Sequence, residues 1–504
     1  MNALDKLILL VPRLTKSEKR AFTLAQKDSD YHYLYQLILE NQNSNSTAVA
    51  NLYQQSRPNS NTNVTAIYLY DRIIDTLCSL EERKNTNMQL LHKLHASKVL
   101  MRKSFFTDAL ELIREVMTES KKHKNNEIFL MASQAELDLL LKLDFVGLRE
   151  DDLAKRHRDV EETILAIRKS EGLGALYDIL KYRTYHYDIM RSEEQKNKLN
   201  KLLTSEVSLN SSIDVTNFEA LKFHQLFQAT YLMGVHNYKA ALRSLKELIN
   251  IFKENPSIWD GNKYYFIEAI ETALKGLRCS KQYGSIEFFL SELDFVKTRN
   301  TLLISYIYLL KLQYRTIPHI DMGEFQEAYK LIQVDKATAL KHLNSVSIDE
   351  QAELTLYIAI VEFGMKNYHR VKEVLNPIIF KSKHYNILPI IRTIRLINLM
   401  AIYELGEIDD FDYEVKSLKR SLGTDKQSYK TESLVIKYIQ RPKLYFSLDE
   451  KNLTKWKEQI YQIRQDVYER QLLKIFDFTK WIEAKLTKTP LSDVLKEGIE
   501  VDAQ

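Results

Sequence analysis

The feature that most constrains this fold is a three-residue pattern that recurs along the chain at nearly constant spacing. Tyr238, Ala241 and Leu245 share one face of a predicted helix, because positions i, i+3 and i+7 lie on one side of a helix. The same order of an aromatic, a small or branched, and an apolar residue begins at four other aromatics: Phe106, Tyr283, Phe325 and Tyr368. From Tyr238 onward, successive aromatics are 45, 42 and 43 residues apart. This spacing predicts stacked helical hairpins of about 43 residues each, and therefore an all-α chain.

The same spacing predicts further hairpins in stretches where the three-residue pattern itself is lost. The gap from Phe106 to Tyr238 is 132 residues, or three units of 44, which predicts two degenerate hairpins between them. Their helices are expected on either side of residues 142–147 and of residues 191–194. Beyond Tyr368 the next step falls on Phe411, followed seven residues later by Leu418.

These hairpins resemble the tetratricopeptide family, in which Gly-x-aromatic precedes the second helix and alanine follows three residues after the aromatic. Residues 323–328, Gly-Glu-Phe-Gln-Glu-Ala, match that order, and residues 104–109 match it with serine in place of glycine. Gly234 and Gly364 stand two residues earlier, which predicts a longer turn. The resemblance implies a right-handed superhelical array of antiparallel hairpins, with the first helices lining a concave groove. The family unit is nearer 34 residues, so HEAT-type hairpins remain an alternative description.

Four regions are expected. Residues 1–85 form an N-terminal helical cap, which includes a capping box that begins at Thr15 and ends at Glu18. Residues 86–440 form the repeat array, because the pattern falls within them. Residues 441–486 carry two apolar helices that cap the array, and residues 487–504 are expected to be a flexible tail.

Composition argues against several classes of function. The net charge of +5 comes from 72 Lys and Arg against 67 Asp and Glu, which is too weak an excess to require nucleic acid, so such a partner is unlikely. The two cysteines form no disulfide framework, which favours the cytoplasm. The apolar run from Leu7 to Val11 is too short for a signal-peptide core, and no 18-residue apolar stretch predicts a membrane span.

No sequence motif predicts catalysis, a cofactor or a metal. Gly-rich phosphate loops, HExxH, GxSxG and CxxC are all missing from the sequence. His92 and His95 could share a helix face, but no neighbouring ligand completes a metal site. His319 and Asp321 precede a turn, where a loop hydrogen bond is the more economical interpretation than a catalytic dyad.

Two sets of polar residues are candidate groove-binding residues. Arg392, Arg395 and Asn398 form a polar row beside the buried stripe of one predicted first helix, where two guanidiniums could clamp a carboxylate or phosphate. The alternative is an internal salt bridge or a surface row. Arg183 and His186 belong to an aromatic and basic tract that could hold a peptide. In the alternative interpretation, Tyr182 and Tyr185 of this tract are core positions beside Ile179 and Ile189, leaving Arg183 and His186 on another face.

The sequence therefore predicts a non-catalytic scaffold or adaptor that binds a peptide or partner protein in a concave groove. The alternative is a regulatory protein whose array responds to a peptide or small ligand. Nucleic-acid binding ranks below both, and an enzyme ranks last.

Overall fold

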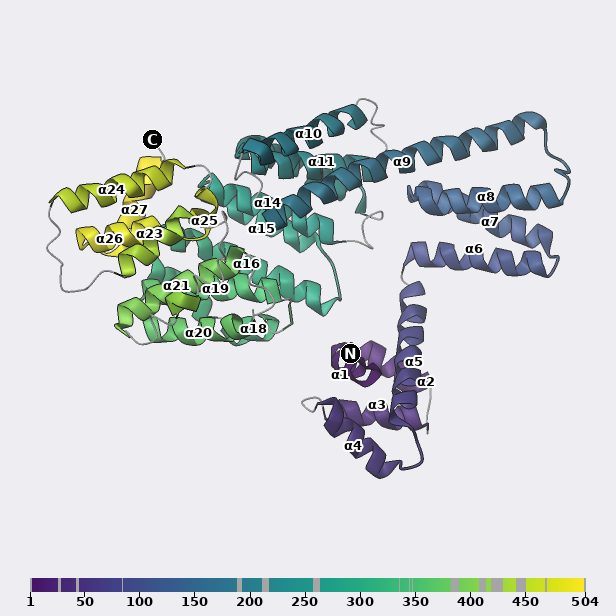
Figure 1. Cartoon of the computed structure of the whole chain (residues 1–504). Coiled ribbons are helices and arrows are strands. Elements are labelled where there is room, and N and C mark those ends of the chain that lie inside the picture. The colour runs from purple at the N-terminus through teal and green to yellow at the C-terminus, as the bar shows by residue number, and fades with distance from the viewer. Residues whose placement is uncertain are drawn as a thin grey trace. The chain divides into compact units, whose positions relative to one another are not determined.

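The computed structural model describes most of the chain, and every secondary-structure element in the described part is a helix. No strand occurs there, so the all-α prediction is confirmed for those residues. The chain divides into two compact units, residues 1–167 (unit 1) and residues 168–504 (unit 2), which are described separately (Figure 1). The described ranges are 2–25, 29–41, 45–83, 85–187, 193–210, 217–256, 263–334, 336–343, 345–346, 348–381, 389–407, 414–417, 429–440, 450–466 and 469–502.

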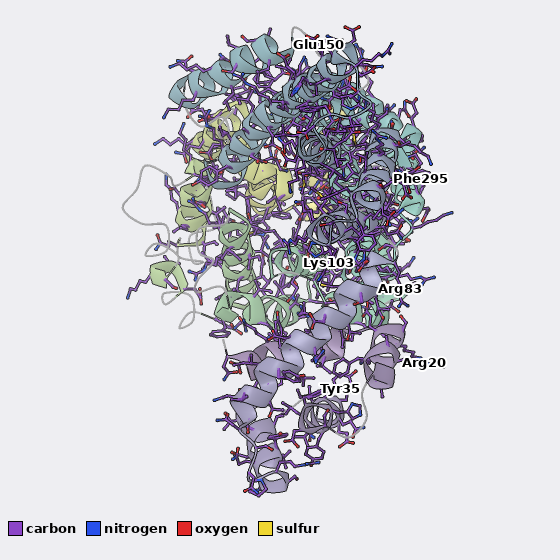
Figure 2. The ribbon with its side chains drawn as sticks, turned by 90° about the vertical axis from the view of Figure 1, so that its right-hand side faces the viewer. Arg20, Tyr35, Arg83, Lys103, Glu150 and Phe295 are labelled. Carbon is purple, nitrogen blue, oxygen red and sulfur yellow. The ribbon has the colours of Figure 1, made fainter. Side chains whose placement is uncertain are left out.

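Unit 1 begins with a group of helices that encloses its own apolar core. The predicted capping box is present: the Thr15 backbone N–H donates to the Glu18 carboxylate at 2.7 Å, and the Glu18 N–H donates to Thr15 Oγ1 at 3.3 Å. Tyr35, labelled in Figure 2, is buried in this core, and burial raises its pKa to about 12. The helices are α1 (Ala3–Leu10), the 3-10 turn η1 (Val11–Arg13), α2 (Lys16–Ala25), α3 (Asp30–Glu40), α4 (Ser46–Ser56) and α5 (Thr62–Glu82).

A second core in unit 1 lies among three consecutive helices: α6 (Thr86–Arg102), α7 (Phe106–Lys122) and α8 (Asn126–Lys142). Glu136 on α8 is a buried carboxylate whose side chain is only 3% exposed. It accepts hydrogen bonds from Arg114 Nε on α7 at 2.9 Å and from Arg156 Nε on the following helix at 3.0 Å. Two cations therefore match one carboxylate, and the ion pairs tie three helices together.

Unit 2 contains a run of helical hairpins, in each of which the earlier helix is called the first helix and the later one the second. The first helices α11, α14, α16, α19 and α21 contact one another in that order, and each second helix contacts the first helices before and after it (Figure 1). An additional helix, α18, contacts α16 and α17. The bounds are α10 (Glu193–Asn210), α11 (Phe218–Gly234), α12 (Tyr238–Glu254), α14 (Tyr264–Cys279), η2 (Tyr283–Ser285), α15 (Ile286–Glu292), η3 (Leu293–Phe295), α16 (Thr301–Asp321), α17 (Phe325–Val334), α18 (Lys336–Leu343), α19 (Ile348–Gly364), α20 (Tyr368–Lys381) and α21 (Pro389–Leu405).

The middle of the chain differs from the prediction of two degenerate hairpins. One continuous helix, α9 (Glu150–Tyr187), has 38 residues and replaces two of the four expected helices, and the boundary between the units falls within it. Gly172 and Gly174 do not interrupt α9. A Cβ on these glycines would lie 3.3 Å from the side chains of Leu209 on α10 and Phe223 on α11, respectively. The two glycines are therefore close-packing positions and not turns.

The repeated pattern marks the same place in every hairpin where it occurs. Its aromatic residue is the first residue of a second helix in four copies: Phe106 of α7, Tyr238 of α12, Phe325 of α17 and Tyr368 of α20. In the fifth copy, Tyr283 is the first residue of the 3-10 turn η2 that leads into α15. The residues three and seven positions later are all buried: Ala109, Ile113, Ala241, Leu245, Ile286, Leu290, Ala328, Ile332, Val371 and Leu375. The copy predicted at Phe411 and Leu418 lies outside the described residues.

The turn before each second helix also has one backbone conformation. The residue two positions before the aromatic has a positive φ in all five copies: Ser104, His236, Lys281, Gly323 and Lys366. The next backbone N–H donates to the carbonyl five residues earlier, as in the Schellman motif that ends many helices. The longer turn predicted from Gly234 and Gly364 is therefore wrong. Gly364 serves packing instead, since a Cβ there would lie 2.2 Å from the Phe325 ring.

The C-terminal helices pack against the hairpins of unit 2. Trp481 Nε1 and Lys485 Nζ both donate to the Glu404 carboxylate on α21, at 3.0 Å and 2.7 Å. Where a flexible tail was expected over residues 487–504, the chain forms a further helix in which Val494 and Leu495 are buried. These helices are α23 (Lys430–Ile439), α24 (Glu450–Gln465), α25 (Arg470–Ile475), α26 (Phe478–Thr487) and α27 (Leu491–Asp502).

Candidate functional site

A cavity of about 430 Å³ lies on the first-helix side of the hairpins in unit 2. All five first helices, α11, α14, α16, α19 and α21, contribute lining residues, and no second helix does so among the described residues. The wall is completed by His236 in the turn between α11 and α12, Lys181 and Thr184 of α9, Tyr429 beside α23, and Leu472 and Ile475 of α25. A volume of this size is within the range of sites that hold a small ligand or a few side chains.

Arg278 on α14 holds one wall of the cavity together. Its Nε and Nη2 donate to the two carboxylate oxygens of Asp321 at 2.9 and 2.7 Å, and Nη1 donates to the Tyr357 hydroxyl at 2.6 Å. Nη2 also donates to the Ile475 carbonyl at 3.0 Å. Burial alone would lower the pKa of Arg278, but the Asp321 carboxylate outweighs burial and raises it. Arg278 thus remains charged and links α14, α16, α19 and α25.

A second ion pair lies one helical turn earlier on α14. Lys275 Nζ is 2.5 Å from the Glu271 carboxylate, which also accepts a hydrogen bond from the Tyr306 hydroxyl at 2.5 Å. Burial alone would raise the pKa of Glu271, but the Lys275 ammonium lowers it. Further along the cavity, Glu268 pairs with Lys181 and accepts from the Tyr177 hydroxyl at 2.8 Å. Both carboxylates therefore have a cation of their own.

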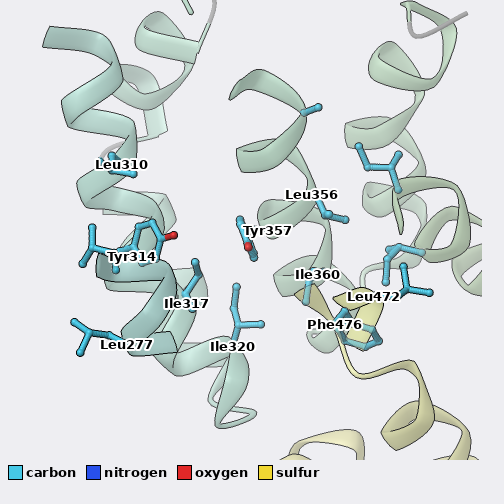
Figure 3. Close-up of a cluster of buried hydrophobic side chains, with 14 of the residues drawn as sticks. Leu277, Leu310, Tyr314, Ile317, Ile320, Leu356, Tyr357, Ile360, Leu472 and Phe476 are labelled. Atoms are coloured by element: carbon cyan, nitrogen blue, oxygen red, sulfur yellow. The ribbon is translucent and has the colours of Figure 1, made fainter. Parts of the chain in front are cut away.

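Glu353 on α19 is the carboxylate that lines the cavity without such a partner. Gln313 Nε2 on α16 donates to it at 2.8 Å, and it forms no ion pair with the residues that the structure describes. Burial raises the pKa of Glu353, and the nearby Lys275 ammonium opposes that effect. On the same side, the Tyr314 hydroxyl points from α16 toward α19, which carries Tyr357 (Figure 3). The cavity therefore combines tyrosines with one carboxylate that has no counter-ion among the residues that the structure describes.

The groove-binding residues predicted on α21 lie next to the cavity residues and not among them. Arg392 donates to both carboxylate oxygens of Glu432 on α23, at 2.8 and 2.6 Å, which is the internal salt bridge that the sequence left as an alternative. Asn398 is buried, Arg395 is half-buried, and neither contributes to the lining. Thr393, one residue beyond Arg392, faces the cavity instead. Whether the predicted row binds a partner stays a prediction.

The predictions for α9 have a similar outcome. Arg183 Nη1 donates to the Lys198 carbonyl at 2.9 Å, whereas Lys181 and Thr184 line the cavity. The His186 side chain lies outside the described residues. The alternative that made Tyr182 and Ile179 core positions is wrong, because they are 55% and 43% exposed. The Tyr185 side chain and Ile189, which belong to the same alternative, lie outside the described residues. The core residues of this part of α9 are Leu173, Tyr177 and Leu180.

Two of the histidines singled out from the sequence, His319 and His92, have local partners. His319 Nδ1 is 2.7 Å from a Glu324 carboxylate oxygen, while Asp321 contacts Arg278, so His319 and Asp321 do not form a dyad. His92 Nδ1 lies 2.8 Å from Glu82. Among the described residues, no group of three or more potential metal ligands was found, and no helix is both long and apolar enough to cross a membrane.

The charged residues in and behind the cavity wall on α14 were not among the residues predicted from the sequence, although the sequence contains a signal for them. Glu268, Glu271, Lys275 and Arg278 fall at i, i+3, i+7 and i+10, a polar row on an otherwise apolar helix. Such a row on a first helix predicts a polar face toward the concave side, but only the structure shows which of its charges are matched. No protein-family model, curated protein or solved structure matches this chain.

Proposed function

We propose that this protein is a non-catalytic binding module whose unit 2 is a tetratricopeptide-like solenoid, and that its cavity takes a segment of a peptide or partner protein. The observation that carries the proposal is that the cavity is lined by all five first helices and by none of the second helices described. Solenoids of stacked hairpins typically bind extended partners on such a surface. The recurring left-handed turn and the ordered contacts between neighbouring helices support the solenoid description.

The charged groups support binding more than catalysis. Arg278, Lys275 and Lys181 are each held by a carboxylate, so none is poised as a nucleophile or a proton acceptor. Such fixed groups suit orientation of a ligand, because a bound partner finds its polar contacts already in place.

The test is a selection of peptides from a displayed library on the full-length protein. Thr184→Trp would narrow the cavity, and Thr204→Trp on α10 is its matched control: both threonines are exposed and donate to the carbonyl four residues earlier. We expect selected peptides to bind the wild-type protein and the control equally, and Thr184→Trp to weaken binding by about tenfold or more, since a large side chain would displace contact area. A selection without binders, or binders indifferent to Thr184→Trp, would contradict the proposal.

One observation favours regulation as a second candidate function. Helix α9 carries Lys181 and Thr184 at the cavity and also Arg156, which belongs to the ion pairs of unit 1. A ligand in the cavity would therefore contact a helix that continues into the other unit. Hydrogen exchange of backbone amides over residues 150–167 tests this candidate: slower exchange on peptide binding supports it, and unchanged exchange removes it.

A further inference from the structure

The charged groups in and behind the cavity wall of unit 2 are unequal in number. Three cations each have one carboxylate, in the pairs Lys181–Glu268, Lys275–Glu271 and Arg278–Asp321. Glu353 is the fourth carboxylate, and it forms no ion pair with a described residue. When these seven groups are all ionised they sum to one negative charge, which is carried by Glu353, a residue that lines the cavity. Glu353 is partly buried, and a carboxylate partly shielded from water without a counter-ion is costly, so a ligand that supplies the missing cation is favoured.

The groups around Glu353 leave several hydrogen-bond acceptor sites of its carboxylate unfilled. From α14, Lys275 and Arg278 attract its charge and Glu271 repels it, and from α16 the Gln313 amide donates its one hydrogen bond. A carboxylate has about four acceptor sites, so several sites remain for an incoming donor. Burial disfavours the ionised form, and an approaching cation would reverse that effect.

The rest of the wall suits the stem of a basic side chain. Met233, Leu472 and Ile475 provide apolar surface, and Tyr314 and Tyr357 provide rings and hydroxyl groups (Figure 3). Lysine and arginine combine an aliphatic stem with a terminal charge, so they match a wall that offers both apolar surface and a carboxylate. An anionic group fits less well, since it would compete with the carboxylates that already hold the cations of the wall.

We propose that the cavity takes a basic side chain of the bound peptide, a lysine ammonium or an arginine guanidinium, with its charge placed against Glu353. This inference rests on the proposed peptide-binding function. It goes beyond that function because it specifies the chemistry of the residue that enters the cavity.

The experiment uses the peptides recovered by the selection on full-length protein, labelled with a fluorophore and followed by anisotropy. Each lysine is replaced in turn by Nε-acetyllysine and each arginine by citrulline, which removes the charge and keeps the stem. On the protein side, Glu353→Gln removes the charge and keeps an oxygen that can accept from Gln313. Glu287→Gln on α15 is the control, because Glu287 is exposed and pairs with Arg315 on the surface.

One neutralised position is expected to weaken binding by about tenfold or more, as does loss of one partner of a buried charge pair. Glu353→Gln is expected to cause the same loss, and the neutralised peptide is expected to lose nothing further on that variant. Wild-type binding should weaken as the pH falls through the raised pKa of Glu353 and the carboxylate gains a proton, and binding to Glu353→Gln should not. Glu287→Gln should bind like the wild type.

The outcomes separate the two proposals. Recovered peptides that contain no lysine or arginine, or that bind Glu353→Gln as tightly as the wild type, would overturn the basic-side-chain proposal while leaving peptide binding intact if Thr184→Trp still weakens it. Additive losses of affinity from the neutralised peptide residue and from Glu353→Gln would also overturn it, because they would show that the two charged groups do not contact each other. Failure to recover any peptide would instead contradict the proposed function itself.

Discussion

Two carboxylates, one in each unit, show how differently the same group is used in similar helical surroundings. Glu136 in unit 1 is matched by Arg114 and Arg156 and joins three helices. Glu353 in unit 2 has an amide donor, no ion pair among the described residues, and a cavity in front of it. A carboxylate with its cations in place stabilises the fold, whereas a carboxylate that still lacks one can contribute to binding. The difference lies in the partners and not in burial alone.

The largest loss of stability is expected when the Arg278 side chain is removed. Its ion pair with Asp321 in unit 2 is the counterpart of the ion pairs that Glu136 forms in unit 1. Arg278→Met leaves Asp321 without its cation and should lower the free energy of unfolding by about 3 kcal/mol, as for other broken buried pairs. Urea denaturation of the full-length protein measures the loss. Arg315→Met, which breaks an exposed pair with Glu287, should cost less than about 1 kcal/mol. Equal losses would show that Arg278 is no better placed than a surface residue.

A smaller loss is expected in unit 1. Glu136→Gln keeps a hydrogen-bond acceptor but removes the charge that holds two arginines, so it should cost about 2 kcal/mol. The loss is smaller than at Arg278 because Arg114 is half exposed and can be hydrated. Glu115→Gln, in an exposed pair with Lys93, is the control in the same denaturation experiment. If both variants lose the same stability, Glu136 is not the structural carboxylate described above.

The turns offer a test in which the two units should behave alike. Ser104 in unit 1 and Lys366 in unit 2 both have positive φ, so glycine at either position should raise the free energy of unfolding by about 0.5–1 kcal/mol. Thermal unfolding of each variant measures the gain. Arg243→Gly, at an exposed position in the interior of α12, should instead lose about 1 kcal/mol. A loss at Ser104 or Lys366 would mean that the side chain there contributes more than the strain costs.

The smallest effect on stability is expected at Glu353, where the comparison is sharpest. Burial raises its pKa in the folded state, so ionising it opposes folding. Its favourable contribution is complete below the ordinary glutamate pKa and declines as the pH rises through the raised value. Glu353→Gln should therefore match the wild type in acid and gain up to about 0.5 kcal/mol near neutral pH. Denaturation curves at several pH values check this; a loss as large as that of Glu136→Gln would remove the distinction.

Much of the hairpin arrangement could be predicted from the sequence, because one stripe of residues has to face the core in every unit. Tyr238, Ala241 and Leu245 were sufficient to place the start and the buried face of the other second helices. Helix α9 was not predicted as one element, because two hairpins were inferred there from the repeat spacing alone, and a glycine inside a helical pattern is compatible with either a turn or a close approach. The structure shows that Gly172 and Gly174 are close approaches.

The candidate site was less predictable than the fold. A polar row on a helix shows which residues can face a cavity, but pairing depends on helices that are distant in sequence. Arg278 and Asp321 are 43 residues apart, and Gln313 and Glu353 are 40 apart. The same limit applied to Arg392, whose partner Glu432 is also 40 residues away and lies on α23. Spacing alone could not show which of these charges would be matched.

The shared turn has a consequence for how a chain of this kind can diverge. Its left-handed residue is serine, histidine, lysine or glycine in different hairpins, while the backbone path and the closing hydrogen bond remain the same. Each non-glycine version costs on the order of 1 kcal/mol, which the packed helices on either side can absorb. Substitutions at this position can therefore accumulate until the repeats no longer look alike in sequence. Related hairpins of this kind would then still share the positive φ angle of the turn after their amino-acid sequences had ceased to be similar.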